Sequence, residues 1–177
     1  MNITTIAGSG EKGYAGDGGP ATQASMDNPF NVAIDLSGRF LYIADCFNYC
    51  IRRVDLENSV IATIAGMDEA GYTGDGGLAA EAKLDEIYAI QVDTNGDVYI
   101  VQRFSPSIRK IDVSTGIITT VAGDGTVGYG GDGGSAIKVQ MREPNDCALD
   151  GRGGLLIADV QDHRIRRLDI QTGIITT

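Results

Sequence analysis

The chain has 177 residues, of which 42% are hydrophobic, 25 are glycine and only 4 are proline. This apolar content is sufficient for a packed core and excludes a disordered chain, which lacks the apolar surface needed to offset the entropy of ordering. The 24 acidic and 14 basic residues give a net charge of −10. Affinity for nucleic acid comes mainly from Lys and Arg that neutralise phosphates, so we expect no nucleic-acid partner.

The sequence shows neither an apolar run of membrane-spanning length nor the pattern of a signal peptide. We therefore expect a soluble chain, and no compartment signal is present. Cys46, Cys50 and Cys147 make an odd number of cysteines, and the first two are close enough in sequence to pair only across a tight turn. With a single histidine in the chain, this spacing is a weak zinc signal, so we expect reduced thiols and no metal site.

A six-residue phrase recurs three times and divides the chain into equal units. It reads Tyr-x-Gly-Asp-Gly-Gly and occupies residues 14–19, 72–77 and 129–134. The phrase could form a phosphate-binding loop or a calcium loop, but no copy leads into a long helix and each supplies a single carboxylate. We therefore interpret it as a structural connection, in which glycines permit positive φ and the aspartate caps the short helix or the turn. These aspartates are Asp17, Asp75 and Asp132.

Each unit predicts four short strands, described here for the first copy. The strand over residues 3–8 comes first, and residues 21–26, after the glycine-rich phrase, suit one helical turn. Residues 31–35 alternate between apolar and polar, and a glycine-containing hairpin turn links them to a strand over residues 41–45. After a loop of about five residues, a further strand covers residues 51–55. The pattern then starts again.

Four short strands repeated at a fixed period are typical of a β-propeller. We therefore predict an all-β chain of four-stranded antiparallel blades, with three blades in one half-propeller domain over residues 1–177. The repeats cover approximately residues 3–60, 61–117 and 118–177. One blade cannot bury both faces of its sheet, so each must stack on its neighbours.

The core of each unit resembles the NHL-repeat family. The first copy contains Tyr-Ile-Ala-Asp at 42–45 and Ile-Arg-Arg-Val-Asp at 51–55, and the third contains Asp-His-Arg-Ile at 162–165. The Thr-Ile-Ala-Gly and Gly-Asp-Gly-Gly phrases resemble a bacterial subgroup. This resemblance implies a six-bladed ring, and such propellers serve as binding scaffolds, RNA readers and occasional lyases. The lyases use several zinc-binding histidines, whereas His163 is the only histidine here, which argues against that activity.

Three blades are fewer than a propeller ring needs, and an isolated arc would expose two apolar blade faces. A two-fold dimer would close a ring of six blades, so we expect a homodimer. Residues 3–5 repeat as residues 175–177. We expect the N-terminal strand of each chain to complete the last blade of its partner, and the C-terminal strand to fray. Alternatively, the three blades belong to a longer propeller chain.

Other repeated polar residues suggest structural roles. One arginine of each basic pair, such as Arg52-Arg53, is expected to reach Asp35, Asp93 or Asp150, or a neighbouring blade. The carboxylates of Asp45 and Asp159 are expected to hold the loops that follow them through backbone N–H groups.

The second unit departs from the other two near the expected channel mouth. Gln102 stands where the other copies have aspartate, and Arg103, Phe104 and Tyr88 offer a cation and two aromatic faces. We predict that they contribute to a rim that binds a ligand or partner; the alternative is ordinary drift in one blade. The predicted rim consists of Phe30, Asn31, Phe47, Tyr88, Gln102, Arg103, Phe104, Asn145 and Asp146.

The sequence therefore favours a non-enzymatic binding or scaffold module that self-associates into a closed ring, with no catalytic residue and no cofactor. The alternative is a propeller hydrolase or lactonase with a central Ca²⁺ held at the channel mouth by groups such as Asn31, Asp146 and Asp159.

Overall fold

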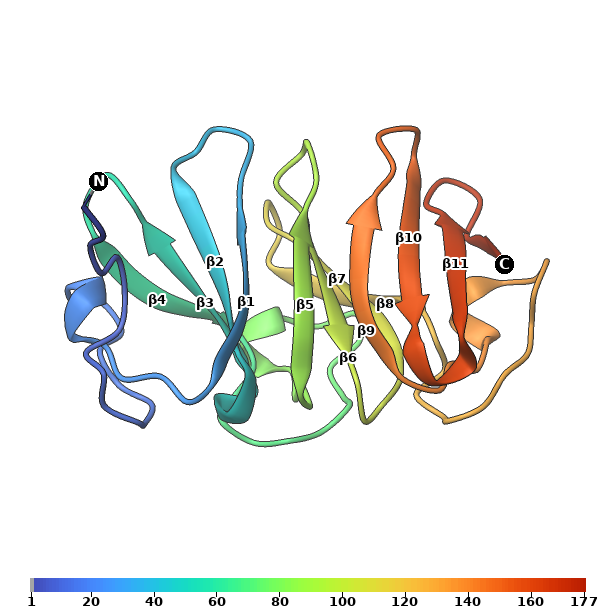
Figure 1. The fold of residues 1–177 in the computed structure, drawn as a ribbon, viewed down its shortest axis with the longest axis horizontal. Helices are drawn as coiled ribbons and strands as arrows, with labels where there is room; N and C mark the ends of the chain where they lie inside the picture. Colours follow the sequence, from blue (N-terminus) through green and yellow to red (C-terminus); the bar gives the residue numbers. More distant parts are fainter. Residues whose placement is uncertain (1) are drawn as a thin grey trace.

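Three four-stranded antiparallel sheets stand side by side in chain order (Figure 1). The structure is a computed structural model that describes residues 2–177. The two chain ends lie at opposite ends of the row of sheets (Figure 1). The all-β architecture of three four-stranded units predicted from the repeats is confirmed. In the described part of the chain, no helix is long and apolar enough to cross a membrane.

The sheets are named blades 1 to 3. Blade 1 consists of β1 (Pro29–Ile34), β2 (Phe40–Asp45), β3 (Cys50–Asp55) and β4 (Val60–Ala65). Blade 2 consists of β5 (Ile87–Val92), β6 (Val98–Gln102), β7 (Ser107–Asp112) and β8 (Ile117–Ala122). Blade 3 consists of β9 (Pro144–Leu149), β10 (Gly154–Asp159), β11 (Arg164–Asp169) and β12 (Ile174–Thr176). One-turn 3-10 helices occupy η1 (Ala21–Gln23), η2 (Cys46–Asn48), η3 (Ala79–Glu81), η4 (Ala136–Lys138) and η5 (Val160–Asp162).

Each blade takes its outermost strand from the start of the following repeat. In blade 1 the Ile-Ala-Thr segment of the second repeat forms β4, where Ile61 pairs with Val54. The N-terminal copy of this segment, residues 3–8, is not a strand, because the blade that it would complete is not part of this arc. The strand predicted there is therefore not formed. At the other end, Ile175 is buried and pairs with Leu168, so the structure does not show the predicted fraying.

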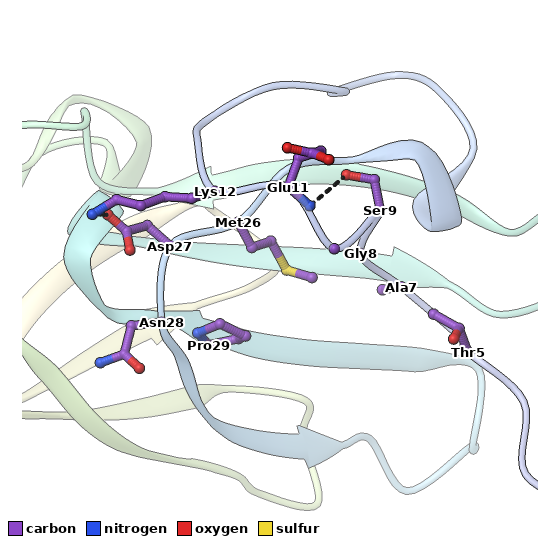
Figure 2. Close-up of a pocket in the computed structure, with 11 residues that line it drawn as sticks. Thr5, Ala7, Gly8, Ser9, Glu11, Lys12, Met26, Asp27, Asn28 and Pro29 are labelled. Carbon is purple, nitrogen blue, oxygen red and sulfur yellow. Dashed lines mark hydrogen bonds and ion pairs between the residues drawn. The ribbon is translucent and has the colours of Figure 1, made fainter.

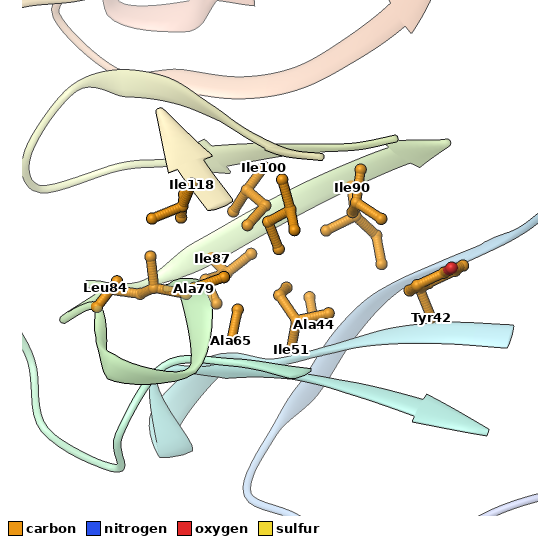
Figure 3. Close-up of a cluster of buried hydrophobic side chains, with 13 residues drawn as sticks. Tyr42, Ala44, Ile51, Ala65, Ala79, Leu84, Ile87, Ile90, Ile100 and Ile118 are labelled. Carbon is orange, nitrogen blue, oxygen red and sulfur yellow. The ribbon is translucent and has the colours of Figure 1, made fainter. Parts of the chain in front are cut away.

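The core lies between the blades. Tyr42, Ala44 and Ile51 of blade 1 face Ile90 and Ile100 of blade 2 across the first boundary (Figure 3). Blades 2 and 3 meet through the same repeat positions in a second cluster. Because strand side chains alternate between faces, every blade offers one apolar set to the preceding blade and another to the following one.

In each blade a buried arginine ties the connector, which is the segment that carries the Tyr-x-Gly-Asp-Gly-Gly phrase, to the sheet. In blade 1, Nη2 of Arg52 lies 2.8 Å from Oδ1 of Asp17, and Oδ2 of Asp17 accepts from the Thr63 backbone N–H at 3.0 Å. The Tyr14 ring stacks 5.3 Å from the guanidinium carbon, and its hydroxyl hydrogen-bonds Thr63 at 3.0 Å. The phrase that recurs in the sequence therefore supplies both an ion-pair partner and an aromatic lid for one arginine.

The other two blades repeat this arrangement. Arg109 pairs with Asp75 at 2.8 Å, and Arg166 pairs with Asp132 at 3.2 Å. In the described structure η1, η3 and η4 have no side-chain cap, so of the two expected roles for the three aspartates, the capping of these helices is wrong. The expected pairing with the strand-end aspartates occurs for Arg167, which bonds Asp150 at 2.8 Å.

Glycine is required within the phrase for a steric reason as well as a conformational one. Gly74 has φ of +89°, and a Cβ added there would stand 2.8 Å from the Cα of Ala82. A side chain at this point would push the connector off the helix that it folds against.

Aspartates in the turns between strands make the structure acid-sensitive. Hydrogen bonds from the turn lower the pKa of Asp112, Asp150 and Asp169, and a bond from Arg39 lowers that of Asp55 to about 2. A carboxyl whose pKa is lower in the folded chain than in the unfolded chain stabilises the fold above its unfolded pKa of about 3.9. That stabilisation is lost as the pH falls through the folded value.

We therefore predict that the unfolding temperature falls between about pH 4 and pH 2. Burial raises the pKa of Asp45 and Asp85, so these two groups oppose the trend. Thermal unfolding followed by circular dichroism at pH 5 and pH 2.5 measures the balance. Asp169→Asn, which keeps an acceptor for Thr172, should reduce the acid sensitivity; an unfolding temperature that rises on acidification contradicts the assignment.

Candidate binding rim

The predicted rim lies at one edge of the sheets, away from the β5–β6 hairpin. Tyr88 is near the start of β5, Gln102 ends β6, and Arg103 and Phe104 begin the loop that leads to β7. In Figure 1 this is the lower edge of blade 2. The innermost strands β1, β5 and β9 are neighbours, so residues at their starts approach one another across blades.

Four of the predicted rim residues form one cluster. The Phe30 and Tyr88 rings have centroids 4.6 Å apart and are tilted by 42°. The guanidinium of Arg103 lies 5.0 Å from the Tyr88 ring centroid and 5.3 Å from that of Phe104, and it donates to the Tyr88 hydroxyl at 2.8 Å. Phe30 is 52% exposed and Phe104 is 62% exposed. The cluster therefore exposes aromatic surface from blades 1 and 2 to solvent.

The charge of Arg103 is already neutralised by a residue that the sequence analysis did not select. Nε and Nη2 of Arg103 lie 2.9 and 2.8 Å from Oε1 of Glu143, at the entrance to β9. A second carboxylate, that of Glu86, lies 3.8 Å from Nη1. Arg103 is therefore a clamp between blades 2 and 3 rather than a free cation for a ligand.

The other predicted rim residues each have their own contacts. The Asn31 side chain accepts from the Ile90 N–H at 3.1 Å and so ties β1 to β5. Asp146 accepts from the neighbouring Cys147 N–H, and Phe47 is exposed in η2. Oδ1 of Asn145 is buried without a hydrogen-bond partner in the described structure.

Gln102 is fully buried and so does not form part of the rim surface. In the other blades the counterpart carboxylate holds the loop before the innermost strand: Asp45 accepts from the Asp27 N–H at 2.7 Å, and Asp159 accepts from the Glu143 N–H at 2.9 Å. The sequence had predicted the loop that follows these aspartates. In blade 2 the carboxylate lies on the other side of this contact. Asp85, in the loop before the innermost strand, accepts from the Ser105 N–H.

The described residues contain no group of three metal-ligating side chains arranged to hold an ion. Both carboxylate oxygens of Asp159 already accept backbone hydrogen bonds.

The three cysteines are free and buried, and burial raises the pKa of Cys46 to about 11 and that of Cys147 to about 12. Thiols with such pKa values carry little thiolate at neutral pH and are poor nucleophiles.

Stacked four-stranded sheets around adjacent inner strands define a β-propeller-type repeat protein. Residues 67–130 match the family model of the Teneurin NHL domain. The chain is 26% identical over 163 residues to Protein SUPPRESSOR OF QUENCHING 1, chloroplastic, of Arabidopsis thaliana, covering 89% of this chain and 15% of that protein. It is 24% identical to mouse Teneurin-1 over 251 aligned residues, covering 94% of this chain and 9% of that protein.

Bovine NHL repeat-containing protein 2 is also similar, with 24% identity over 176 residues that cover 94% of this chain and 24% of that protein. The chain thus spans a quarter or less of these relatives. An auxiliary nutrient binding protein from Bacteroides ovatus superposes with a TM-score of 0.64 at 24% identity, over 78% of this chain and 36% of that chain. This structural likeness shows the fold. Together with the repeats, the matches confirm the resemblance to the NHL-repeat family.

Arg103 and Phe104 should differ in their contributions to the free energy of unfolding. Arg103→Ala should lower the unfolding free energy, with a coupling to Glu143→Gln of about 1 kcal/mol in a double-mutant cycle, because the pair is only partly exposed. Phe104→Ala should leave stability within about 0.5 kcal/mol, since the ring is exposed. Urea unfolding of the wild type, the two single variants, their double variant and Phe104→Ala measures both values, and additive effects of the Arg103 and Glu143 changes would exclude the clamp.

Proposed function

We propose that this chain is a non-enzymatic binding module whose propeller ring is closed by a second copy. One observation carries the proposal. The two ends of the arc present the two complementary halves of the contact that joins the blades inside the chain.

The first half is the open face of blade 1. Val32 is 61% exposed, whereas Ile90 at the same position in blade 2 is fully buried against blade 1. Ile34, two residues further along β1, lies on the same face and is also exposed. These side chains stand where a preceding blade would cover them.

The second half is the outer face of blade 3. Ile165 is 60% exposed, whereas its counterparts Ile51 and Ile108 are fully buried under the following blade. With Leu156 and Ala158, Ile165 lines an apolar groove of about 220 Å³. This face corresponds to the side of blade 1 that receives blade 2.

The two open faces should therefore fit one another as the internal faces do. Blade 1 joins blade 2, and blade 2 joins blade 3, through the same repeat positions. Blade 3 of one copy can meet blade 1 of a second copy through those positions again. A two-fold pair makes this contact twice and closes six blades into a ring, so no apolar face is left open.

The N-terminal segment supplies a second element of this contact. In blade 1 a Cβ added to Gly66 would stand 2.7 Å from the Cα of Cys50, because β3 begins directly above it. At Gly8 the nearest atom is the flexible methyl group of Met26, at 2.9 Å. The unfilled space is a pocket of about 530 Å³ that also contacts Thr5 and Asp27 (Figure 2).

The counterpart of β3 for this pocket is β11 of a second copy. β12 pairs with Arg167, Leu168 and Asp169, and among residues 2–177 no outer strand pairs with the edge of β11 at Arg164 and Ile165. The corresponding pair in blade 1 is Ile51 with Ala65. By this register, Ala7 of one copy would pair with Ile165 of the other. Residues 3–5 of the first copy would then compete with residues 175–177 of the second for the same place beside β11.

Ring closure would display the rim cluster twice, once on each copy. Exposed aromatic side chains such as Phe30 and Phe104 supply binding energy when a partner covers them. The proposed role of the rim is therefore to anchor a partner, with Arg103 and Glu143 fixing the blades beneath it.

Cysteine trapping tests the proposed register. Ala7→Cys together with Ile165→Cys should give a covalent dimer on a non-reducing gel after mild oxidation, because paired strand residues approach within disulfide range. The matched control, Ile51→Cys with Ala65→Cys, should crosslink within one chain. If the control crosslinks and the first pair yields only monomer, the proposed contact is wrong.

A charge on the contact face provides an independent test. Ile165→Asp should dissociate the dimer, because the carboxylate would be buried without a partner. Ile137→Asp, at a similarly exposed position in η4 outside the contact, should leave the dimer intact. Equal behaviour of the two variants contradicts the assignment of the face.

A further inference from the structure

A cavity of about 350 Å³ lies between blades 2 and 3, at the edge of the sheets opposite the rim. It is situated near the β5–β6 and β9–β10 hairpin tips, at the upper edge in Figure 1. Its apolar wall consists of the side chains of Tyr99, Leu149 and Ile170. Its polar lining includes Asp93, Thr94 and Gln171, and backbone of glycines 151, 153 and 154 completes the boundary.

The two boundaries between blades differ at one repeat position near the cavity. In blade 1 that position holds Phe40, which packs against the apolar cluster between blades 1 and 2. Val92 and Val113, the counterparts of Leu149 and Ile170, pack against the same cluster. In blade 2 the position holds Asp97, which bonds Lys110 at 2.6 Å and the Val113 N–H at 3.2 Å. The second boundary therefore lacks an aromatic ring that the first possesses.

Asp93 supplies a carboxylate to the polar side of the cavity. Oδ1 of Asp93 accepts from the Asn95 N–H at 2.8 Å and from the Asp97 N–H at 3.0 Å. Among residues 2–177, no cationic side chain forms an ion pair with Asp93, while Lys110 is engaged by Asp97. The net charge of −10 further favours a cation over an anion at this position.

We propose that this cavity binds a small arylalkyl amine. The aromatic ring of the ligand would occupy the space that Phe40 accounts for in the preceding boundary, against Tyr99 and Leu149. Its ammonium group would bond the carboxylate of Asp93. The volume lies within the range of small-molecule sites, which combine an apolar wall with a few polar groups. All lining residues belong to one chain, so the inference is independent of ring closure.

Titration with benzylamine, followed by amide chemical shifts of the ¹⁵N-labelled chain, tests this site. Shifts should change at Thr94, Gly151 and Gly153, and benzyl alcohol, which lacks the charge, should bind more weakly. Ethylamine, which lacks the ring, should also bind more weakly. Absence of changes at these amides, or equal affinity for the alcohol and the amine, overturns the proposal.

Two variants separate the ring from the charge. Asp93→Asn keeps Oδ1 as an acceptor for the turn, so the fold should persist while affinity for benzylamine falls roughly tenfold. Leu149→Phe should fill the cavity and abolish binding, with circular dichroism verifying the fold. Benzylamine affinity that survives either change in a folded chain also overturns the proposal.

Discussion

The burial of one arginine per blade is the constraint on which the rest of the structure depends. Arg52, Arg109 and Arg166 are almost entirely removed from solvent, and a buried charge is costly unless it is paired and hydrogen-bonded. Each guanidinium meets its requirement by holding an aspartate and a carbonyl of the connector against the sheet. Within residues 2–177 the Nε atom has no hydrogen-bond partner in any of the three copies, so even this defect repeats.

This constraint explains why the connector sequence is uniform while the rim is not. The connector must return a carboxylate, an aromatic ring and tight glycine turns to the same arginine in every blade. The rim residues are under no such constraint, and in blade 2 they differ from their counterparts in the other two blades. Arg103 there reaches Glu143 of blade 3 and stacks on Tyr88, whereas the corresponding residues in blades 1 and 3 are Cys46 and Val160. Asymmetry within a repeat array is where binding specificity can arise without disturbing the fold.

Much of the fold could be predicted because the sequence repeats a period-two strand pattern with glycine turns between strands. The strands β1 to β11, the helical turns η1, η3 and η4 and the face alternation follow from local chemistry, whereas η2 and η5 lie where a loop was predicted. Pairings between distant segments could not be read in this way, as Arg109 with Asp75 and Arg103 with Glu143 illustrate. Gln102 was misplaced on the rim, although its alignment with Asp45 and Asp159, which were expected to hold loops, pointed to a buried position. The strand predicted over residues 3–8 does not form in the single chain, because the blade that it would complete lies outside the arc.

The proposed closure of the ring by a second copy would connect the open blade faces, the pocket at Gly8 and the edge of β11 at Arg164 and Ile165. Multi-angle light scattering of the wild-type chain at micromolar concentration tests this most directly. With a chain mass of 18.6 kDa, the account predicts a species of about 37 kDa, twice the single chain. A stable particle at the mass of one chain, unchanged with concentration, would contradict it.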